Sequence, residues 1–249
     1  MNKKISILVV DDDANLGDSL TDILDAKGYD ARFATRGKEA LTIIKENEID
    51  AIFLDIRMPE MNGVETLSCI KKYSPMTSVV MITAYAEDEL VEQAYIEGAL
   101  QVLKKPLDIE KLISFLEKLQ RLKTLLIVDD SKSFCITLRE CLDDLNYNVD
   151  IAYNVDEGIE KFDENNAELL LIDIKLNGDN GLDLINTIRE RGSKSAIILM
   201  SGYVNQFQPI IDDAIKNKVD HFIEKPFEMK NIIKIIGEVT RKRLKDVLS

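Results

Sequence analysis

The sequence is poor in the residues on which many enzymes and extracellular proteins depend. It has no tryptophan, one histidine, three cysteines and five prolines among 249 residues. An odd number of cysteines without metal-ligand spacing makes no disulfide framework and is typical of a reducing compartment. We therefore expect Cys69, Cys135 and Cys141 to pack as small apolar side chains. The histidine, His221, lies before Phe222 in an apolar run, so we predict a strand residue without a catalytic role.

Long apolar runs and an excess of positive charge are also lacking. No stretch approaches the roughly 20 residues that span a bilayer. The start, Lys3-Lys4 followed by Ile5 to Val10, ends at Asp11 before a signal peptide is complete. The formal net charge is −13 and both halves of the chain are acidic, so we expect no direct nucleic-acid binding. These features predict an acidic cytoplasmic protein without membrane contact.

What the sequence does contain is one pattern that occurs twice. The run Ile7 to Asp12 reappears 118 residues later as Leu125 to Asp130. A repeat over nearly the whole chain predicts two domains, residues 1–121 and 122–249. Further residues of special chemistry match at the same offset, or at 120 for the last pair: Tyr29 and Tyr147, Asp55 and Asp173, Gly63 and Gly181, Thr83 and Ser201, Tyr85 and Tyr203, and Lys105-Pro106 and Lys225-Pro226.

Short apolar runs alternate with amphipathic segments in each copy. Runs this short and this rich in Val and Ile predict strands that are buried on both faces, and the segments between them predict helices. Such alternation is typical of a parallel sheet covered on both sides, so we expect five βα units per domain. Asp13 and Ser131 precede the first helices and suit the N-cap position. In the first copy the apolar runs are residues 5–10, 30–34, 51–54, 78–82 and 101–103.

No flexible tether is apparent between the two copies. Apolar residues at helical spacing, from Leu112 to Leu122, predict a helix that runs to Lys123, and the next strand begins at Thr124. Because no Gly/Ser/Pro-rich stretch intervenes, we expect a continuous helix to join the domains. One last helix is predicted from Met229 to Leu248.

Charged and hydroxyl side chains interrupt the apolar pattern where the predicted strands end. In the first copy these are Asp11-Asp12, Asp55, Thr83 and Lys105. Because parallel strands end at one edge of the sheet, we expect these groups to share one pocket. Two carboxylates about 5 Å apart repel by about 3 kcal/mol at an effective dielectric constant of about 20. A hard cation with oxygen ligands offsets this repulsion, and Mg²⁺ suits the site.

The second copy repeats the same chemistry with Asp129-Asp130, Asp173, Ser201 and Lys225. Solvated helix caps would explain one Asp-Asp pair, but hardly the same five positions twice. Mg²⁺, a carboxylate and a lysine together suit phosphoryl transfer, with the carboxylate as nucleophile. The expected nucleophile is the middle-strand aspartate, Asp55 or Asp173, and the acidic pair would hold the metal ion.

These motifs resemble the receiver domain of two-component response regulators. The resemblance covers residues 3–121 and again 122–246. It implies two flavodoxin-like (βα)5 domains, each a five-stranded doubly wound parallel sheet. It also implies phosphorylation of an aspartate by the phosphohistidine of a sensor histidine kinase or a histidine phosphotransfer protein. In the first copy it rests on the Ile7 to Asp13 run, on Leu54 to Gly63, on Met81 to Tyr85 and on Lys104-Lys105-Pro106.

The resemblance assigns a role to each matching position. It makes Asp55 and Asp173 the phosphoacceptors, Asp12 and Asp130 direct Mg²⁺ ligands, and Asp11 and Asp129 the other members of the acidic pairs. The backbone carbonyls of Arg57 and Lys175 match the remaining protein ligand, Thr83 and Ser201 the switch hydroxyl, and Lys105 and Lys225 the phosphate-binding lysine.

The chain departs from the family pattern in two places. The switch aromatic falls at Val102 in the first copy and at Phe222 in the second, so an aromatic switch is expected only in the second. After Asp173, the loop Leu176 to Gly181 lacks the proline of the first copy and gains a glycine. This exchange predicts a looser loop.

Taken together, the sequence favours a response regulator of two receiver domains without an effector domain. It would be phosphorylated in trans and would signal to a downstream protein target through its last strands and helices. Any homodimer is expected through the second domain, because the last helix of the first is committed to the join. We expect slow self-dephosphorylation and no turnover of an external substrate.

Other functions suit this sequence less well or remain as alternatives. A phosphorylation-independent adaptor, or a fragment of a larger hybrid or effector protein, stays open. A Mg²⁺-dependent small-molecule phosphohydrolase needs an acid two residues after the nucleophile, where this chain has Arg57 and Lys175. The basic run Arg241 to Lys245 is more typical of a solvated helix end than of DNA binding.

Overall fold

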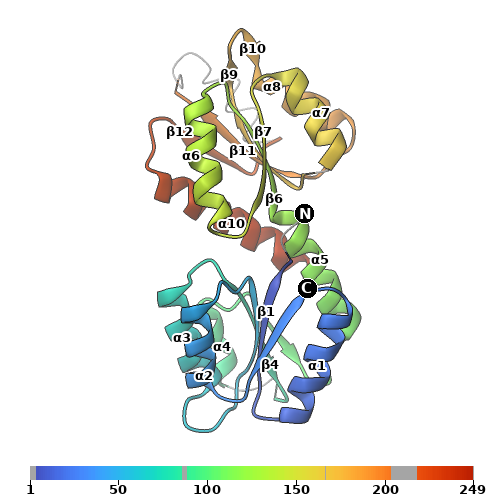
Figure 1. The fold of residues 1–249 in the computed structure, drawn as a ribbon, viewed down its shortest axis with the longest axis vertical. Helices are drawn as coiled ribbons and strands as arrows, with labels where there is room; N and C mark the ends of the chain where they lie inside the picture. The colour runs from blue at the N-terminus through green and yellow to red at the C-terminus, as the bar shows by residue number, and fades with distance from the viewer. Residues whose placement is uncertain (1–3, 86–88, 166, 203–217, 249) are drawn as a thin grey trace. The chain divides into compact units, whose positions relative to one another are not determined.

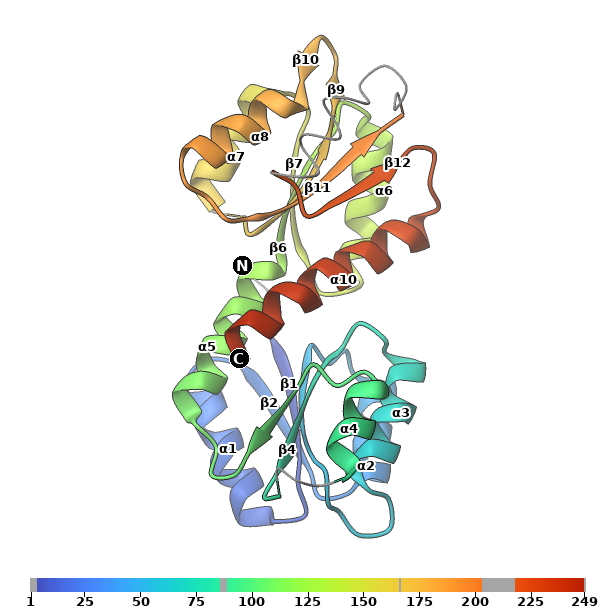
Figure 2. The same ribbon diagram turned by 180° about the vertical axis from the view of Figure 1, so that it is seen from behind.

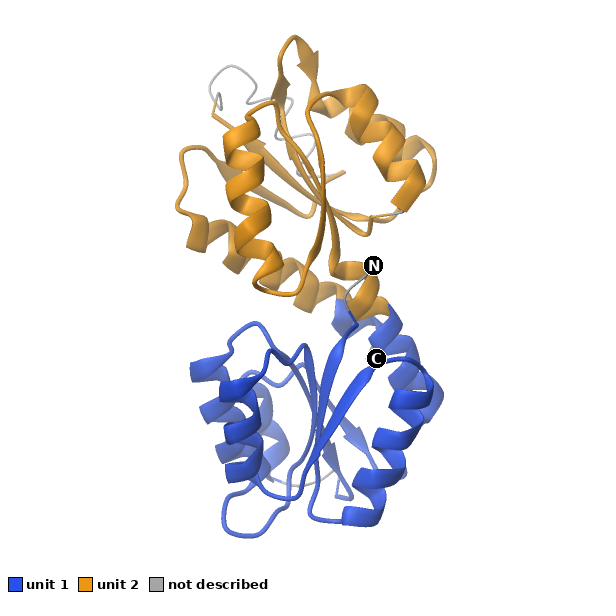
Figure 3. Cartoon of the chain, viewed as in Figure 1, with its two compact units in different colours: residues 1–117, 244–249 blue, residues 118–243 orange. Residues whose placement is uncertain are grey.

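The computed structural model describes residues 4–85, 89–165, 167–202 and 218–248. The chain divides into two compact units, residues 1–117 with 244–249, and residues 118–243 (Figure 3). The boundary that we predict from sequence, between residues 121 and 122, lies near this division and stays a prediction. Residues 203–217, which include Tyr203 and the two extra residues expected after it, lie outside the described residues.

The first unit is a parallel five-stranded sheet in the order β2-β1-β3-β4-β5. Helices α2, α3 and α4 cover one face of this sheet, and α1 and α5 cover the other (Figure 1). The elements are β1 (Ser6–Val10), α1 (Ala14–Ala26), β2 (Asp30–Ala34), α2 (Gly37–Glu46), β3 (Ala51–Asp55), α3 (Gly63–Tyr73), β4 (Ser78–Thr83), α4 (Glu89–Ile96), β5 (Gln101–Lys104) and α5 (Ile109–Leu122).

The second unit repeats this topology, with its main sheet in the order β7-β6-β8-β11-β12. Helices α6 and α10 pack on one face of the sheet, and α7 and α8 on the other (Figure 2). The elements are β6 (Thr124–Val128), α6 (Lys132–Asp143), β7 (Asn148–Ala152), α7 (Val155–Asn165), β8 (Leu169–Asp173), β9 (Lys175–Leu176), β10 (Asp179–Asn180), α8 (Gly181–Glu190), β11 (Ala196–Ser201), β12 (His221–Glu224) and α10 (Met229–Leu248).

The central strands are buried on both faces, as their unbroken apolar sequences predict. On β3, Ile52 and Leu54 pack into the core beneath α2, α3 and α4. Phe53 points to the opposite face, where its ring meets Phe115 of α5 edge-on at 6.1 Å between centroids. The side-chain alternation of one strand thus builds both layers of the core. The predicted flavodoxin-like α/β fold is confirmed in both units.

The structure forms the predicted join between the two sheets and one of the two predicted side-chain N-caps. Helix α5 ends at Leu122 and β6 begins at Thr124, so a continuous helix leads into the second sheet, as predicted. Asp13 caps α1 by accepting hydrogen bonds from the N–H groups of Asn15 and Leu16. Ser131 occupies the same position at α6 but makes no side-chain cap bond.

The histidine and the three cysteines lie within strands and helices of the fold. His221 is the first residue of β12, the strand that was predicted for it. The three cysteines are free, and Cys135 is buried beside the carboxyl end of β6. Burial is the main reason that the pKa of the Cys135 thiol rises to about 12. Among the described residues, no helix combines the length and the apolar character that a membrane crossing needs.

Two glycines bring the loop after each middle strand close to that strand. A Cβ atom on Gly63 would lie 2.0 Å from the carbonyl oxygen of Asp55, and one on Gly181 would lie 2.0 Å from that of Asp173. Because backbone atoms would have to move, we expect Gly63→Ala and Gly181→Ala each to lower the free energy of unfolding of their own unit by about 1–3 kcal/mol. Urea unfolding followed by circular dichroism measures this loss.

The matched control for Gly63→Ala is Ser68→Ala on the same helix, α3. Ser68 is half-buried, and its replacement should change the free energy of unfolding by less than about 0.5 kcal/mol. If Gly63→Ala unfolds at the same urea concentration as this control, the close approach does not constrain the loop.

Candidate functional site

The sheet topology brings five side chains of the first unit to one edge. Asp11 and Asp12 follow β1, Asp55 ends β3, Thr83 ends β4, and Lys105 follows β5. The Nζ atom of Lys105 lies 2.7 Å from an oxygen of Asp11 and 2.7 Å from an oxygen of Asp55. One lysine therefore bridges two carboxylates that are far apart in sequence. The carboxyl ends of β1 and β3 meet at the topological switch point of the sheet, where such folds bind ligands.

The second unit builds the same arrangement from its own residues. Lys225 Nζ lies 2.5 Å from an oxygen of Asp129 and 2.7 Å from an oxygen of Asp173. Asp129 and Asp11 are almost completely buried, with 0% and 1% of their surfaces exposed. The structure thus brings together, in each unit, the acidic pair, the middle-strand aspartate and the lysine that were predicted to share a pocket.

Burial dominates the electrostatics of the middle-strand aspartates. Desolvation raises the pKa of Asp55 above its ordinary value, although hydrogen bonds from Lys105 and from the Arg57 N–H act in the opposite direction. Asp173 shows the same direction, again because of burial and against the hydrogen bond from Lys225. The charged form of each aspartate is therefore costly in this setting.

The pKa of each lysine shifts upward, whereas the pKa of an isolated buried amine falls. Burial alone would lower the pKa of Lys105, but its hydrogen bonds to Asp11 and Asp55 and the attraction of their negative charges together outweigh burial, so the pKa rises. Lys225 behaves in the same way beside Asp129 and Asp173. Both lysines therefore stay protonated and offer a fixed positive charge at the cluster.

Each cluster has the geometry and chemistry of a site for a divalent cation. One oxygen from each of Asp11, Asp12 and Asp55 can be chosen so that all three lie within 4.8 Å of one another, and Asp129, Asp130 and Asp173 meet the same condition. Three carboxylates and one ammonium leave a charge of about −2, and an all-oxygen donor set suits Mg²⁺. The residues present therefore fit the predicted ion.

The loop after the middle strand lies close to its aspartate in both units. The Arg57 N–H donates to Asp55 at 3.1 Å, and the Lys175 N–H lies 3.5 Å from an oxygen of Asp173. The backbone carbonyls of Arg57 and Lys175, named above as metal ligands, belong to these two loops. Their part in metal binding stays a prediction.

The predicted switch residues lie at the same edge or on the last strand. Thr83 is buried, and its hydroxyl donates to the Tyr85 carbonyl and accepts from the Tyr85 N–H, at 3.2 and 3.0 Å. Ser201 is buried at the end of β11. Val102 on β5 and Phe222 on β12 are half-buried, and each packs against the core of its own unit.

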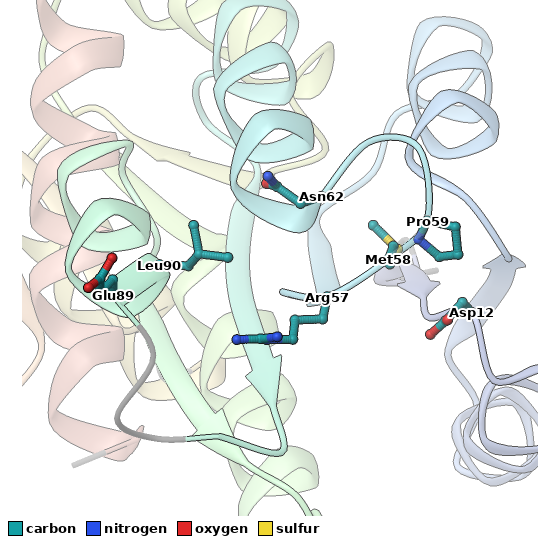
Figure 4. A pocket seen from close by; sticks show the side chains of 7 residues that line it. All are labelled: Asp12, Arg57, Met58, Pro59, Asn62, Glu89 and Leu90. Atoms are coloured by element: carbon teal, nitrogen blue, oxygen red, sulfur yellow. The ribbon is translucent and has the colours of Figure 1, made fainter.

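A pocket of about 770 Å³ opens beside the first cluster (Figure 4). Figure 4 shows Asp12 on one side of this pocket, Glu89 and Leu90 of α4 on the other, and Arg57 between them. The Arg57 guanidinium also lies over the Tyr85 ring, 5.2 Å from its centroid. Of the three carboxylates of the cluster, Asp12 lines this pocket. Its lining residues are Asp12, Arg57, Met58, Pro59, Asn62, Glu89 and Leu90.

The loop after Asp173 differs from its prediction. The exchange of proline for glycine predicts a looser loop, but the structure forms a hairpin in which β9 and β10 pair antiparallel. Asn177 and Gly178 form its turn with φ values of 42° and 109°. A two-residue turn with positive φ at both positions is the type I′ turn, for which Asn-Gly is the strongest sequence signal. That dipeptide could have predicted the hairpin.

An aromatic pair beside Lys225 is a second feature that differs between the two domains and is not predicted from the sequence. Lys225 Nζ lies 5.0 Å from the centroid of the Phe134 ring, and Phe134 meets Phe227 edge-on at 5.8 Å. The first copy has Leu16 and Leu107 at the equivalent positions. Nothing in the local spacing of Phe134 points to a lysine 91 positions further along the chain.

Comparison with known proteins agrees with this geometry. A family model described as the response regulator receiver domain matches residues 7–117 and again residues 125–237. A response regulator receiver protein of Anaeromyxobacter sp. (strain Fw109-5) is 26% identical over 236 residues, which cover 95% of this chain and 95% of that protein.

Other relatives match one receiver domain at a time. Transcriptional regulatory protein ZraR of Escherichia coli (strain K12) is 41% identical over 114 residues, 46% of this chain but 26% of ZraR, so the match spans about a quarter of that relative. Sporulation initiation phosphotransferase F of Bacillus subtilis (strain 168) is 32% identical over 124 residues, 50% of this chain and 98% of that protein.

Among solved structures, the receiver domain of NtrX from Brucella abortus is 33% identical, covers 46% of this chain and 97% of its own, and has a TM-score of 0.43. The family model matches most of both halves of the chain, and both halves have the same fold and the same acidic cluster. The chain therefore belongs to the response regulator receiver family of two-component systems and carries two receiver domains in tandem.

Proposed function

We propose that each receiver domain accepts a phosphoryl group from a phosphohistidine, on Asp55 in the first domain and on Asp173 in the second. The observation that carries this proposal is the lysine that bridges two buried carboxylates, which occurs in both domains at closely similar distances. A structural ion pair would need one carboxylate, whereas this cluster keeps excess negative charge at an accessible edge.

The transfer would follow from the positions of these groups. A carboxylate oxygen of Asp55 forms the new bond to phosphorus, while the bond from phosphorus to the donor's imidazole nitrogen breaks and its electron pair stays on that nitrogen. When bound, Mg²⁺ would offset the negative charge of the phosphoryl oxygens. Asp11, Asp12 and Asp55, with the Arg57 carbonyl, would hold the ion.

Lysine and hydroxyl side chains would complete the site. Lys105 already lies against Asp55, so its ammonium can neutralise an oxygen of the transferred group. The hydroxyl of Thr83 would leave the Tyr85 backbone to meet the new charge. In the second domain Asp129, Asp130 and Asp173, the Lys175 carbonyl, Ser201 and Lys225 would have the equivalent roles.

The phosphoryl donor would be another protein. Receiver domains work with histidine kinases or phosphotransfer proteins, and the only histidine of this sequence, His221, lies in β12. A histidine within a sheet is a poor phosphodonor because it is not on an exposed helix face. We therefore infer phosphorylation in trans, within the cytoplasm, by a sensor histidine kinase or a histidine phosphotransfer protein.

The output would be a protein contact and not the turnover of a substrate. Receiver domains are signalling phosphoacceptors, and the residues two positions after the nucleophiles, Arg57 and Lys175, are no acids that could protonate a leaving group. Phe222 offers the second domain an aromatic switch that Val102 cannot offer the first. We infer a downstream protein partner, and dimerisation, where it occurs, through the second domain.

The phosphoacceptor assignment is tested by intact mass after incubation with Mg²⁺ and acetyl phosphate. We expect two additions of about 80 Da, the mass of a phosphoryl group, on the unmodified sequence. Asp55→Asn and Asp173→Asn should each remove one addition, because an amide oxygen is too weak a nucleophile to attack phosphorus. Two additions on either variant would contradict the assignment, and unchanged circular dichroism would show that both variants fold.

The raised pKa of Asp55 generates a prediction on stability and pH. Because the pKa of Asp55 is above its ordinary value of 3.8, the folded protein binds this proton more tightly than the unfolded chain. The group's contribution to the free energy of unfolding is therefore greatest at low pH and is lost as pH rises through the folded-state pKa. In metal-free buffer at neutral pH, Asp55→Asn should be more stable than the unmodified sequence, since it removes a costly charge.

This advantage of Asp55→Asn should shrink as the pH falls through the folded-state pKa of Asp55 toward 3.8. Urea unfolding at a series of pH values, without divalent metal, measures the difference. Asp22→Asn, at an exposed position of α1, is the matched control for removing one negative charge. An advantage that is equal for both variants, or that grows on acidification, would contradict the effect of burial.

A further inference from the structure

The two domains differ at the position four residues after the phosphoacceptor. The first domain has Pro59 there, and the second has Asn177. Proline has no backbone N–H, whereas the Asn177 N–H donates a hydrogen bond to a carboxylate oxygen of Asp130 at 3.0 Å. The loop of the second domain thus holds Asp130, a member of the acidic pair. In the first domain Pro59 cannot donate the equivalent hydrogen bond.

The hairpin turn explains why this N–H is available. Leu176 and Asp179 pair across the turn, so Asn177 and Gly178 lie outside the two-residue strands. Gly178 adopts φ of 109° without strain, and asparagine tolerates the positive φ of 42° better than most residues. The turn therefore fixes the direction of an N–H that is free to bond to another segment of the chain.

Asp130 is the carboxylate of the second cluster that lies outside the Lys225 bridge. Lys225 bridges Asp129 and Asp173, which are both buried, whereas Asp130 is only half-buried. A carboxylate that is not fully buried loses side-chain freedom when it binds a metal ion. A hydrogen bond to one oxygen restricts the side chain in advance and orients the other oxygen, as outer hydrogen bonds do at many metal sites.

The equivalent loop position of the first domain cannot make this contact. Its Asp12 is exposed, and Pro59 has no N–H to donate. The neighbouring carboxylate of Asp13 caps α1 by accepting hydrogen bonds from Asn15 and Leu16. The orienting hydrogen bond at this loop position is therefore a property of the second domain.

We propose that the Asn177 backbone N–H positions Asp130 for Mg²⁺, so that Mg²⁺ affinity depends on the Asn177-Gly178 turn in the second domain. This inference rests on the proposed Mg²⁺ sites, and it adds Asn177 as a positioning residue that acts through Asp130. Because the turn is present in the second domain and not in the first, a change in the turn would alter Mg²⁺ affinity in the second domain alone.

The test uses the full chain and Mg²⁺ alone, followed by amide signals in ¹H–¹⁵N NMR spectra. Amides near Asp11 and near Asp129 report a separate dissociation constant for each domain. Asn177→Pro removes the N–H and cannot adopt a positive φ, so Mg²⁺ binding by the second domain should weaken about tenfold, the lower end of such effects. Binding by the first domain, which serves as the internal control, should not change.

The matched control is Asn177→Gly, which keeps the N–H and favours the positive φ. Its Mg²⁺ affinity should stay within about twofold of the unmodified sequence. The reciprocal variant, Pro59→Asn with Glu60→Gly, builds an Asn-Gly turn in the first domain. It should strengthen Mg²⁺ binding there by several-fold and leave the second domain unchanged.

The outcomes separate this inference from the proposed function. No Mg²⁺ response in either domain would overturn both. Binding in both domains that Asn177→Pro leaves unchanged or strengthens would overturn the positioning role alone, as would an equal loss in Asn177→Gly. If Asn177→Pro unfolds the second domain, the reciprocal variant decides, and no gain of affinity in the first domain overturns the inference.

Discussion

The ion pair between one lysine and two carboxylates is the interaction on which each receiver domain depends. Asp11 and Asp55 meet because β1 and β3 lie next to each other in the sheet, and Lys105, which is 94 positions from Asp11 in sequence, reaches both from the carboxyl end of the edge strand β5. Without the lysine, two carboxylates would be buried side by side with no compensating charge. The bridge makes their burial tolerable but leaves the cluster negative, and this residual charge favours the binding of a divalent cation.

Much of this arrangement follows from local sequence patterns. The predicted strand at residues 78–82 is observed as Ser78–Thr83, because a short run rich in β-branched residues has few stable alternatives when it is buried on both faces. The position of Asp55 at the end of its strand could be predicted for the same reason. That Asp55 lies against Lys105 required the order of the strands, which came from the alternation of strands and helices and from the family resemblance.

A comparison of single positions does not reveal features that depend on pairs of residues. Loss of a proline and gain of a glycine each argue for a looser loop, yet asparagine and glycine together favour a type I′ hairpin. The contact between Asn177 and Asp130 joins residues 47 positions apart, and the one between Phe134 and Lys225 joins segments further apart still. Neither contact has a periodic signal, so the fold must be known before they can be seen.

The two domains have the same ion pairs within the cluster but different residues around it. The lysine and the two buried carboxylates have closely similar distances in both, whereas the neighbours change from leucine to phenylalanine beside the lysine and from proline to asparagine beside the acidic pair. Phosphorylation would add about two negative charges to a site that already has an excess. We therefore expect the neighbours that contact the metal ligands and the lysine to set how readily each domain accepts that charge, so that two domains with one chemistry respond to different conditions.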